Sequence, residues 1–192
     1  MSGIKTRQTL IEKIKISNDE QYWEKFCDAY KDYLFVIIRN MGLSYHDSEE
    51  LLQEVLLKAW KSLPNFEYNP KKGKFRWWLI TIVKNTVYNY LDKEKRRKQK
   101  LDSTAQLIAD PEIDKLAKQE WEKFVVNKAW ATIQSKFSGE VLEIFAELTN
   151  GKSVREIAEA RQLPPNTIHV YKKRVQKKLY REIAKLDYEL NC

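Results

Sequence analysis

The feature that most limits the possible fold is the segment 75–97, which runs for 23 residues without glycine or proline. Apolar side chains recur in it at helical spacing, and at 1.5 Å per residue it predicts a helix about 34 Å long. Its longest apolar run, WWLITIV, is far shorter than the roughly 20 residues that span a bilayer. The segment therefore predicts a long helix that stays in water.

The remainder of the chain is predicted to be helical as well. Only 5 Gly and 5 Pro occur among its 192 residues, which favours helices over turn-rich β structure. Helical periodicity is lost over residues 99–114, which predicts a linker. The expected fold is all-α, with two small helical domains at 1–98 and 115–192 joined by the linker 99–114. Helices are expected over residues 22–42, from Ser44 or Asp47 to 63, and over 75–97, 116–134, 138–149, 153–161 and 164 onward.

The last two of these helices form a recognisable pattern. Ser153 and Glu156 are spaced as a capping box at the start of a short helix. A tight turn separates it from a longer basic helix, in whose first turn Pro164 or Pro165 is well tolerated. A short helix, a tight turn and a longer basic helix are typical of the helix-turn-helix, a module that binds duplex DNA.

Positive charge is concentrated in two separate zones. Residues 71–100 contain 11 Lys/Arg against two acidic residues, and residues 151–186 contain ten against three. These zones carry net charges of +9 and +7, while the whole chain carries +8, so the remaining residues carry −8. Two basic zones on an otherwise acidic chain predict two nucleic-acid contacts, one in each domain.

The side chains of the two zones predict different partners. The final helix, in the second zone, is expected to enter the major groove of a duplex. In the first zone aromatic rings lie among positive charges, and unpaired bases stack on such rings with about 1–3 kcal/mol per base. The groove candidates are Asn166, Thr167, His169, Val170, Lys173 and Arg174, and the candidates for opened DNA are Phe66, Tyr68, Trp77 and Tyr88 with Lys74, Arg76 and Lys84.

Patterns of catalysis and metal binding are missing from the sequence. His46 and His169 are the only histidines, and neither has a cysteine or a carboxylate at ligand spacing. The GKS at 151–153 resembles the end of a phosphate-binding loop, but Ala146 stands where such a loop needs glycine. We therefore expect no enzyme activity, no metal site and no cofactor.

The cysteines and the first residues bear on the compartment. Cys27 and Cys192 form no disulfide framework, which suits a reducing compartment. The N-terminal segment contains no continuous apolar run of the kind found in a secretory signal. We therefore expect a cytoplasmic protein without membrane insertion.

Three segments, taken in this order, resemble the extracytoplasmic-function (ECF) sigma factors of bacterial RNA polymerase. DSEELLQEVLLKAWKSL resembles the helix that docks on the polymerase clamp helices, and FRWWLITIVKNTVYNYL is similar to the promoter-melting helix. SVREIAEARQLPPNTIHVYKKRVQKKL resembles the module that reads the −35 promoter element. The resemblance covers about residues 22–97 and 121–186. It implies core RNA polymerase, promoter DNA and an anti-sigma factor as partners.

Together with the residue types, the resemblance implies roles for single residues. Polymerase contacts are expected at Glu50, Gln53 and Glu54. Contacts with the melted −10 element are expected at Asn65, Phe66, Tyr68, Lys74, Trp77, Lys84, Asn85, Tyr88, Asn89, Arg96 and Arg97. Contacts with the −35 duplex are expected at Arg155, Asn166, Thr167, His169, Val170, Lys172, Lys173, Arg174 and Lys177. Two positions depart from the family pattern. Glu50 stands where the family usually has Asp, and Gln162 stands where Gly is common.

Other functions are compatible with the same residues. A stand-alone helix-turn-helix repressor or activator would bind duplex DNA without polymerase. A DNA recombinase or nuclease would need clustered carboxylates or hydroxyls, which the sequence does not show, and an RNA-binding regulator is a third alternative. The acidic residues at 49–54 and the run KEKRRKQK also have a simpler explanation, in which they only solvate helix ends.

Overall fold

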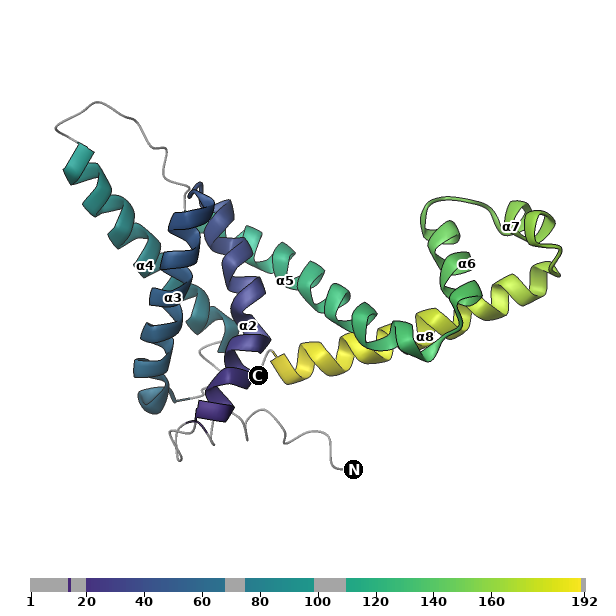
Figure 1. Ribbon diagram of the computed structural model, residues 1–192, viewed down its shortest axis with the longest axis horizontal. Coiled ribbons are helices and arrows are strands. Elements are labelled where there is room, and N and C mark those ends of the chain that lie inside the picture. Colours follow the sequence, from purple (N-terminus) through teal and green to yellow (C-terminus); the bar gives the residue numbers. More distant parts are fainter. Residues whose placement is uncertain (1–13, 15–19, 68–74, 99–109, 191–192) are drawn as a thin grey trace. The chain divides into compact units, whose positions relative to one another are not determined.

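The computed structural model describes residues 14, 20–67, 75–98 and 110–190. Every described element is a helix, as predicted for an all-α fold (Figure 1). The helices are α2 (Glu20–Asn40), α3 (Tyr45–Ser62), α4 (Phe75–Lys98), α5 (Asp110–Ile133), α6 (Gly139–Thr149), α7 (Val154–Arg161) and α8 (Pro165–Leu190), with 3-10 turns at Leu63–Asn65 and Gln134–Lys136. Of the predicted linker 99–114, positions 99–109 lie outside the described residues, and the remaining positions belong to α5.

The helix ends follow local signals in the sequence. Ser44 Oγ accepts a hydrogen bond from Asp47 N at 3.1 Å and caps the start of α3. At the start of α7, Ser153 Oγ accepts from Glu156 N at 3.2 Å, and Glu156 Oε2 accepts from Ser153 N at 2.7 Å. These bonds satisfy backbone N–H groups that the first turn of a helix leaves unpaired. The predicted capping box is therefore confirmed.

The chain divides into two compact units. Unit 1 comprises Met1–Glu122 and Tyr188–Cys192, and unit 2 comprises Lys123–Asp187. In unit 1, helices α2, α3 and α4 pack against one another, and the first half of α5 adds a further apolar row. Buried side chains of unit 1 include Phe26, Leu34, Ile37, Val55, Leu79, Val83, Val87, Ile113, Ala117 and Trp121.

The first half of α5 is held in unit 1 by contacts with α2. Tyr33 Oη donates a hydrogen bond to Ala117 O at 3.0 Å. The Tyr33 and Trp121 ring centres are 5.0 Å apart with their planes at 80°, an edge-to-face arrangement that aromatic pairs prefer. Burial raises the pKa of Tyr33 far above its usual value, so the hydroxyl keeps the proton that it donates. Trp121 itself is only 2% exposed.

Unit 2 is held together by two buried clusters and an ion-pair network. The first cluster is Ile144, Ile157, Ala158 and Ile168, and the second is Ile133, Val141 and Val175. Arg161, in the last turn of α7, lies 3.1 Å from Glu143 and 2.5 Å from Glu147, both on α6. The first cluster and the ion pairs hold α7 against α6 and α8.

Gln162 in the helix-turn-helix turn has a strained backbone. Its φ of 53° and ψ of 38° lie in the left-handed region, which a residue with a Cβ occupies at a cost of about 1 kcal/mol. Replacing Gln162 with glycine is expected to raise the free energy of unfolding of unit 2 by about 0.5–1 kcal/mol. In the matched control, glycine at Gln176 inside α8 should lower it by about 1 kcal/mol. Urea unfolding, followed by circular dichroism, measures the stability of both variants. If Gln162→Gly also lost stability, the backbone at Gln162 would not be strained.

Candidate nucleic-acid interface

Helix α4 presents an aromatic and polar outer face to solvent. Its core side consists of Phe75, Leu79, Ile80, Val83, Thr86 and Val87, all buried. The opposite side carries two rows at helical spacing, Trp77–Lys84–Tyr88–Lys95 and Trp78–Asn85–Asn89–Arg96, which we call the outer face of α4. The polar members Asn85, Asn89, Lys95 and Arg96 are exposed, whereas Trp77, Trp78, Lys84 and Tyr88 are half-buried. The helix thus brings most of the −10 candidates onto one surface.

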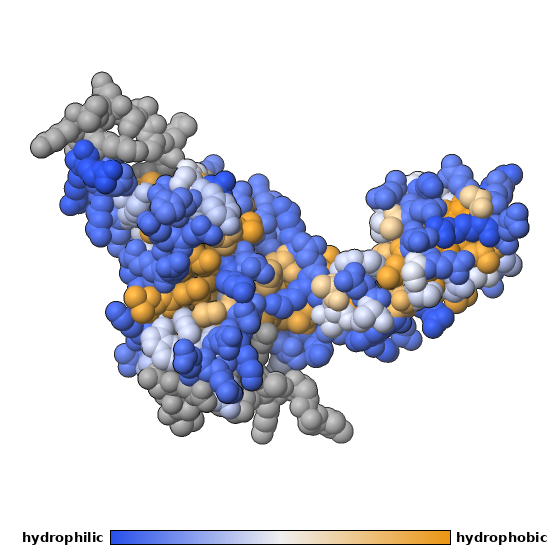
Figure 2. Space-filling model, viewed as in Figure 1, coloured by the Kyte–Doolittle hydropathy of each residue, from blue (hydrophilic) through white to orange (hydrophobic). Residues whose placement is uncertain are grey.

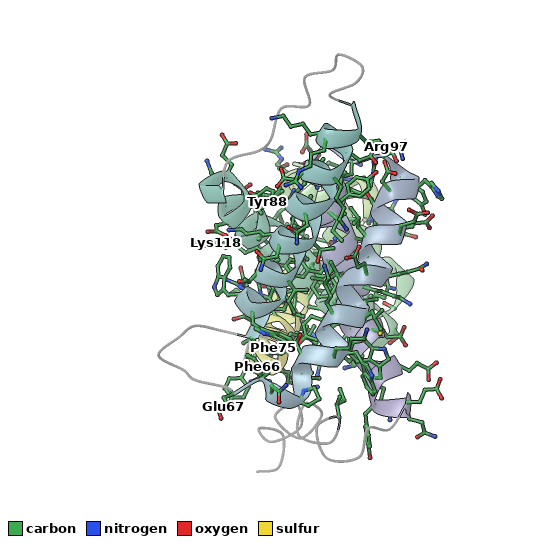
Figure 3. The ribbon with its side chains drawn as sticks, turned by 90° about the vertical axis from the view of Figure 1, so that its left-hand side faces the viewer. Phe66, Glu67, Phe75, Tyr88, Arg97 and Lys118 are labelled. Atoms are coloured by element: carbon green, nitrogen blue, oxygen red, sulfur yellow. The ribbon has the colours of Figure 1, made fainter. Side chains whose placement is uncertain are left out.

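The two ends of α4 have different surroundings. Figure 3 shows Phe66 beside Phe75 at one end of α4 and Arg97 at the other. At 1.5 Å per residue, the helix from Phe75 to Arg97 is about 33 Å long. Figure 2 shows strongly hydrophilic side chains over the end that carries the exposed Lys95, Arg96 and Arg97. Such a length is sufficient for several nucleotides of a single strand.

Lys84 is engaged by a carboxylate. Its Nζ lies 2.7 Å from Asp114 Oδ1 of α5, and its side chain is only 16% exposed. An ion pair in such a partly buried position is screened less by solvent and salt than one at the surface. This ion pair must break before Lys84 can contact a DNA phosphate.

Arg76 was grouped from the sequence with the basic contact residues, and the structure corrects this. Arg76 is 8% exposed. Its guanidinium carbon lies 4.9 Å from the centre of the Trp77 ring and 5.4 Å from that of Trp121, within the range of a cation–π interaction. Its Nε has no hydrogen-bond partner in the described part of the chain. Arg76 therefore links α4 to α5 and presents no charge to DNA.

Phe66 belongs to an aromatic cluster at the start of α4. Its ring centre lies 5.2 Å from that of Phe75 and 4.8 Å from that of Trp78. The half-buried Phe66 ring therefore already has two ring partners, while its neighbour Asn65 is exposed. Two other −10 candidates, Tyr68 and Lys74, lie outside the described residues.

A hydrogen bond between Asp47 and Tyr90 fixes α4 against the start of α3. Ser44 Oγ donates to Asp47 Oδ2 at 2.6 Å, and this bond, together with that from Tyr90, lowers the pKa of Asp47. Burial and the hydrogen bond to Asp47 raise the pKa of Tyr90 to about 12. At neutral pH the carboxylate is therefore ionised, the phenol keeps its proton, and the bond holds α4 in place.

Helix α3 exposes an acidic and polar row that ends in an apolar side chain. Glu50, Gln53, Glu54 and Leu57 follow one another at helical spacing, and Leu57 is 52% exposed. Figure 2 shows apolar side chains reaching the surface over α3. Glu54 Oε1 lies 2.8 Å from Lys58 Nζ in an exposed ion pair. Leu57 is a residue that no sequence pattern singled out, although helical spacing places it on the side of α3 opposite the buried Val55 and Ala59.

Helix α8 exposes a basic row opposite its buried one. Ile168 and Val175 are buried, and Val170 is 44% exposed. The exposed −35 candidates on α8 are Asn166, His169, Val170, Lys173, Arg174 and Lys177, with Thr167 and Lys172 half-buried. On α7, Arg155 is exposed and its Nε donates to Glu159 Oε1 at 2.8 Å. This arrangement offers amide, imidazole and cationic groups to base edges and phosphates, and a valine to a thymine methyl.

Other kinds of chemistry find little support in the described residues. None of their His, Cys, Asp and Glu side chains gather in a group of three or more able to hold a metal ion. Burial raises the pKa of Cys27 to about 11, so its thiol is protonated at neutral pH. Among the helices described, none has the length and apolar character needed to cross a membrane.

The two units match two different family models. Sigma-70 region 2 matches residues 26–97, which include most of α2, all of α3 and nearly all of α4. The model of the bacterial regulatory proteins of the luxR family (GerE) matches residues 137–181, which include α6, α7 and much of α8. The ECF RNA polymerase sigma factor SigW of Bacillus subtilis is 26% identical over 170 residues, 82% of this chain and 86% of SigW. The chain thus contains a sigma-70 region 2 and a luxR-type helix-turn-helix region, and the curated relatives that it resembles are ECF sigma factors. The resemblance seen in the sequence is thereby confirmed.

Two further proteins are similar to this chain. The ECF RNA polymerase sigma factor SigG of Mycobacterium tuberculosis is 37% identical over 70 residues, which are 36% of this chain and 18% of SigG. Among solved structures, CnrH in complex with the cytosolic domain of CnrY is 18% identical, with 91% of this chain and 95% of that chain covered and a TM-score of 0.37. SigW and SigG are both RNA polymerase sigma factors.

Proposed function

We propose that this chain is an ECF sigma factor that binds core RNA polymerase through α3 and recognises its promoter with two separate DNA-binding surfaces. The outer face of α4 binds the melted −10 element, and α8 reads the −35 element as duplex. An anti-sigma factor is a further partner expected from the resemblance. The protein acts in the cytoplasm, because bacterial transcription takes place there.

The observation that supports the −10 assignment most directly is the outer face of α4. Trp77 and Tyr88 are aromatic side chains on a solvent-facing side of a long helix, and Asn85 and Asn89 lie beside them. A duplex offers its base edges but hides its base faces, whereas an opened strand exposes faces that stack on aromatic rings. Amide side chains can then bond the free edges of unstacked bases.

The polymerase assignment rests on the exposed row of α3. Leu57 is an exposed apolar side chain at the end of the row formed by Glu50, Gln53 and Glu54. Protein interfaces commonly combine an apolar centre with a polar rim. The charge of this row also opposes DNA binding, so a protein with a basic surface is the fitting partner.

Promoter opening by the reconstituted holoenzyme tests the proposal. We expect run-off transcripts on promoter-containing genomic fragments only when this chain is added to core polymerase. Replacing Asn85 or Trp77 with alanine should lower the rate of promoter opening about tenfold, the loss expected for one stacked or bonded base. Asn127→Ala, which removes an exposed amide from α5 in unit 2, is the matched control.

The same assay distinguishes melting from other steps. Templates that already contain an unpaired −10 bubble should restore much of the activity of Asn85→Ala, since strand separation is no longer required. If Asn85→Ala and Asn127→Ala open promoters equally fast, the outer face of α4 does not bind the −10 element. Tight duplex binding by the chain without any core-polymerase binding would instead favour a stand-alone regulator, for which the luxR-family match is the supporting observation.

A further inference from the structure

Lys118 of α5 places a positive charge next to the outer face of α4. Lys118 is exposed, and it forms no ion pair with any side chain in the described ranges. Figure 3 shows Lys118 on α5 and Tyr88 on α4 on the same side of unit 1. No sequence pattern indicated a nucleic-acid role for Lys118, since it lies in the acidic part of the chain outside both basic zones.

Two contacts determine where Lys118 lies along α4. Asp114 Oδ1 is 2.7 Å from Lys84 Nζ, and the Trp121 ring is 5.4 Å from the Arg76 guanidinium carbon. The residue number therefore rises along α5 as it falls along α4, so the two helices run antiparallel here. Lys118 lies between these two contacts along α5, so it is level with the turn of α4 that carries Thr81. Thr81 is exposed and lies between Trp77 and Lys84 on the outer face.

The register of α5 directs Lys118 toward this face. Ile113, Ala117 and Trp121 are buried and define the side of α5 that packs into unit 1. Asp114 and Lys118 are one turn apart and share the flank next to that side, and Asp114 on this flank reaches Lys84. Lys115, in contrast, lies on the side of α5 opposite the buried row and is exposed.

The charges of this region make Lys118 the available cation. Lys84 is the only Lys or Arg between residues 77 and 92 of α4, and it is bound to Asp114. Arg76 is buried beneath two indole rings. A strand whose bases stack on Trp77 and Tyr88 still carries one phosphate per nucleotide, and single-strand binding surfaces combine such stacking with positive charge.

We propose that Lys118 binds a backbone phosphate of single-stranded DNA held on the outer face of α4. The inference rests on the −10 function proposed above and adds to it a contact from the segment between the two matched regions. Because a lysine contacts a phosphate as a point charge, the contribution is independent of base sequence.

The test uses the full chain, alone and bound to core polymerase, with a random pool of short fluorescein-labelled single-stranded oligonucleotides. Fluorescence anisotropy is measured over a range of salt concentrations. Lys118→Gln is expected to weaken binding about three- to tenfold and to reduce the slope of log K against log salt by about 0.7, the value for one lost phosphate contact. Lys118→Arg should retain the affinity and the slope, and Lys115→Gln should behave as the unaltered chain.

The variants distinguish failure of this inference from failure of the −10 proposal. If Trp77→Ala weakens binding while Lys118→Gln matches Lys115→Gln in affinity and slope, the phosphate contact is overturned and the −10 function stands. If the unaltered chain binds no single strand, with or without polymerase, both are overturned. Circular dichroism of each variant verifies that the helices are intact.

Discussion

Replacing Glu54 with lysine is expected to weaken binding of core RNA polymerase at least about 30-fold. The few hot-spot residues near the centre of an interface contribute about 2 kcal/mol or more, and each 1.4 kcal/mol changes the dissociation constant tenfold. Glu54 lies one turn from the exposed Leu57, at the centre of the α3 row that we assign to polymerase. Charge reversal there removes one favourable contact and adds a repulsive one.

The same substitution should leave the fold nearly unchanged. The Glu54–Lys58 pair is exposed, with side chains 49% and 40% accessible, and such pairs contribute about 1 kcal/mol or less. Lys58 Nζ also donates to Thr86 Oγ1 at 3.1 Å, so this lysine keeps a partner when Glu54 is lost. A loss of polymerase binding can therefore be read as a loss of contact.

The control is Glu24→Lys, which makes the same charge change at an exposed position of α2. Binding is measured by titrating labelled core polymerase with each variant, and the melting temperature reports stability. Equal affinities for Glu54→Lys and Glu24→Lys would place the polymerase-binding surface elsewhere than on α3.

The helices and their ends were predictable because their signals are local. Ser44, Ser153 and Glu156 lie within four residues of the backbone groups that they cap, so sequence spacing alone identifies them. Gln162 was recognised as a departure in the turn, and its left-handed backbone is one that glycine adopts without a steric cost.

The start of α5 was not predicted because its signal is ambiguous. Residues 99–114, which contain the Asp110–Pro111 pair, lack helical periodicity, so the sequence predicts this helix only from about residue 116. The structure instead begins α5 at Asp110. Proline is well tolerated in the first turn of a helix, where no backbone N–H is needed for an intrahelical bond. Proline at a helix start and proline in a loop look alike in a sequence without tertiary context.

Arg76 and Lys84 show why charge patterns alone do not define a DNA-binding site. Each was counted as an exposed cation because lysine and arginine are seldom buried. Arg76 is instead covered by Trp121, 45 residues later, and Lys84 is paired with Asp114, 30 residues later. Sequence spacing on α4 predicts which side chains share a face, but it holds no information about what another helix places on that face.

Replacing Trp121 with alanine is expected to cost about 3–5 kcal/mol of the stability of unit 1, as for other buried aromatic residues. Trp121 is 2% exposed, meets the Tyr33 ring edge-to-face and covers the Arg76 guanidinium. The variant therefore loses apolar burial, leaves a cavity and removes a cation–π partner from a buried charge. Trp121→Phe, which keeps an aromatic ring, should cost less.

Comparison with Val126→Ala tests whether the first half of α5 packs on unit 1. Val126 lies on the same helix in unit 2 and is 41% exposed, so its truncation should change stability by no more than about 0.5 kcal/mol. Urea unfolding followed by circular dichroism measures both variants. If Trp121→Ala were as stable as Val126→Ala, the first half of α5 would not pack on unit 1 in solution. Lys84 would then be free of Asp114, and Lys118 would no longer lie beside the outer face of α4. A large loss for Trp121→Ala alone would instead mean that this half-helix packs on unit 1 in solution, as the Lys118 contact with opened DNA requires.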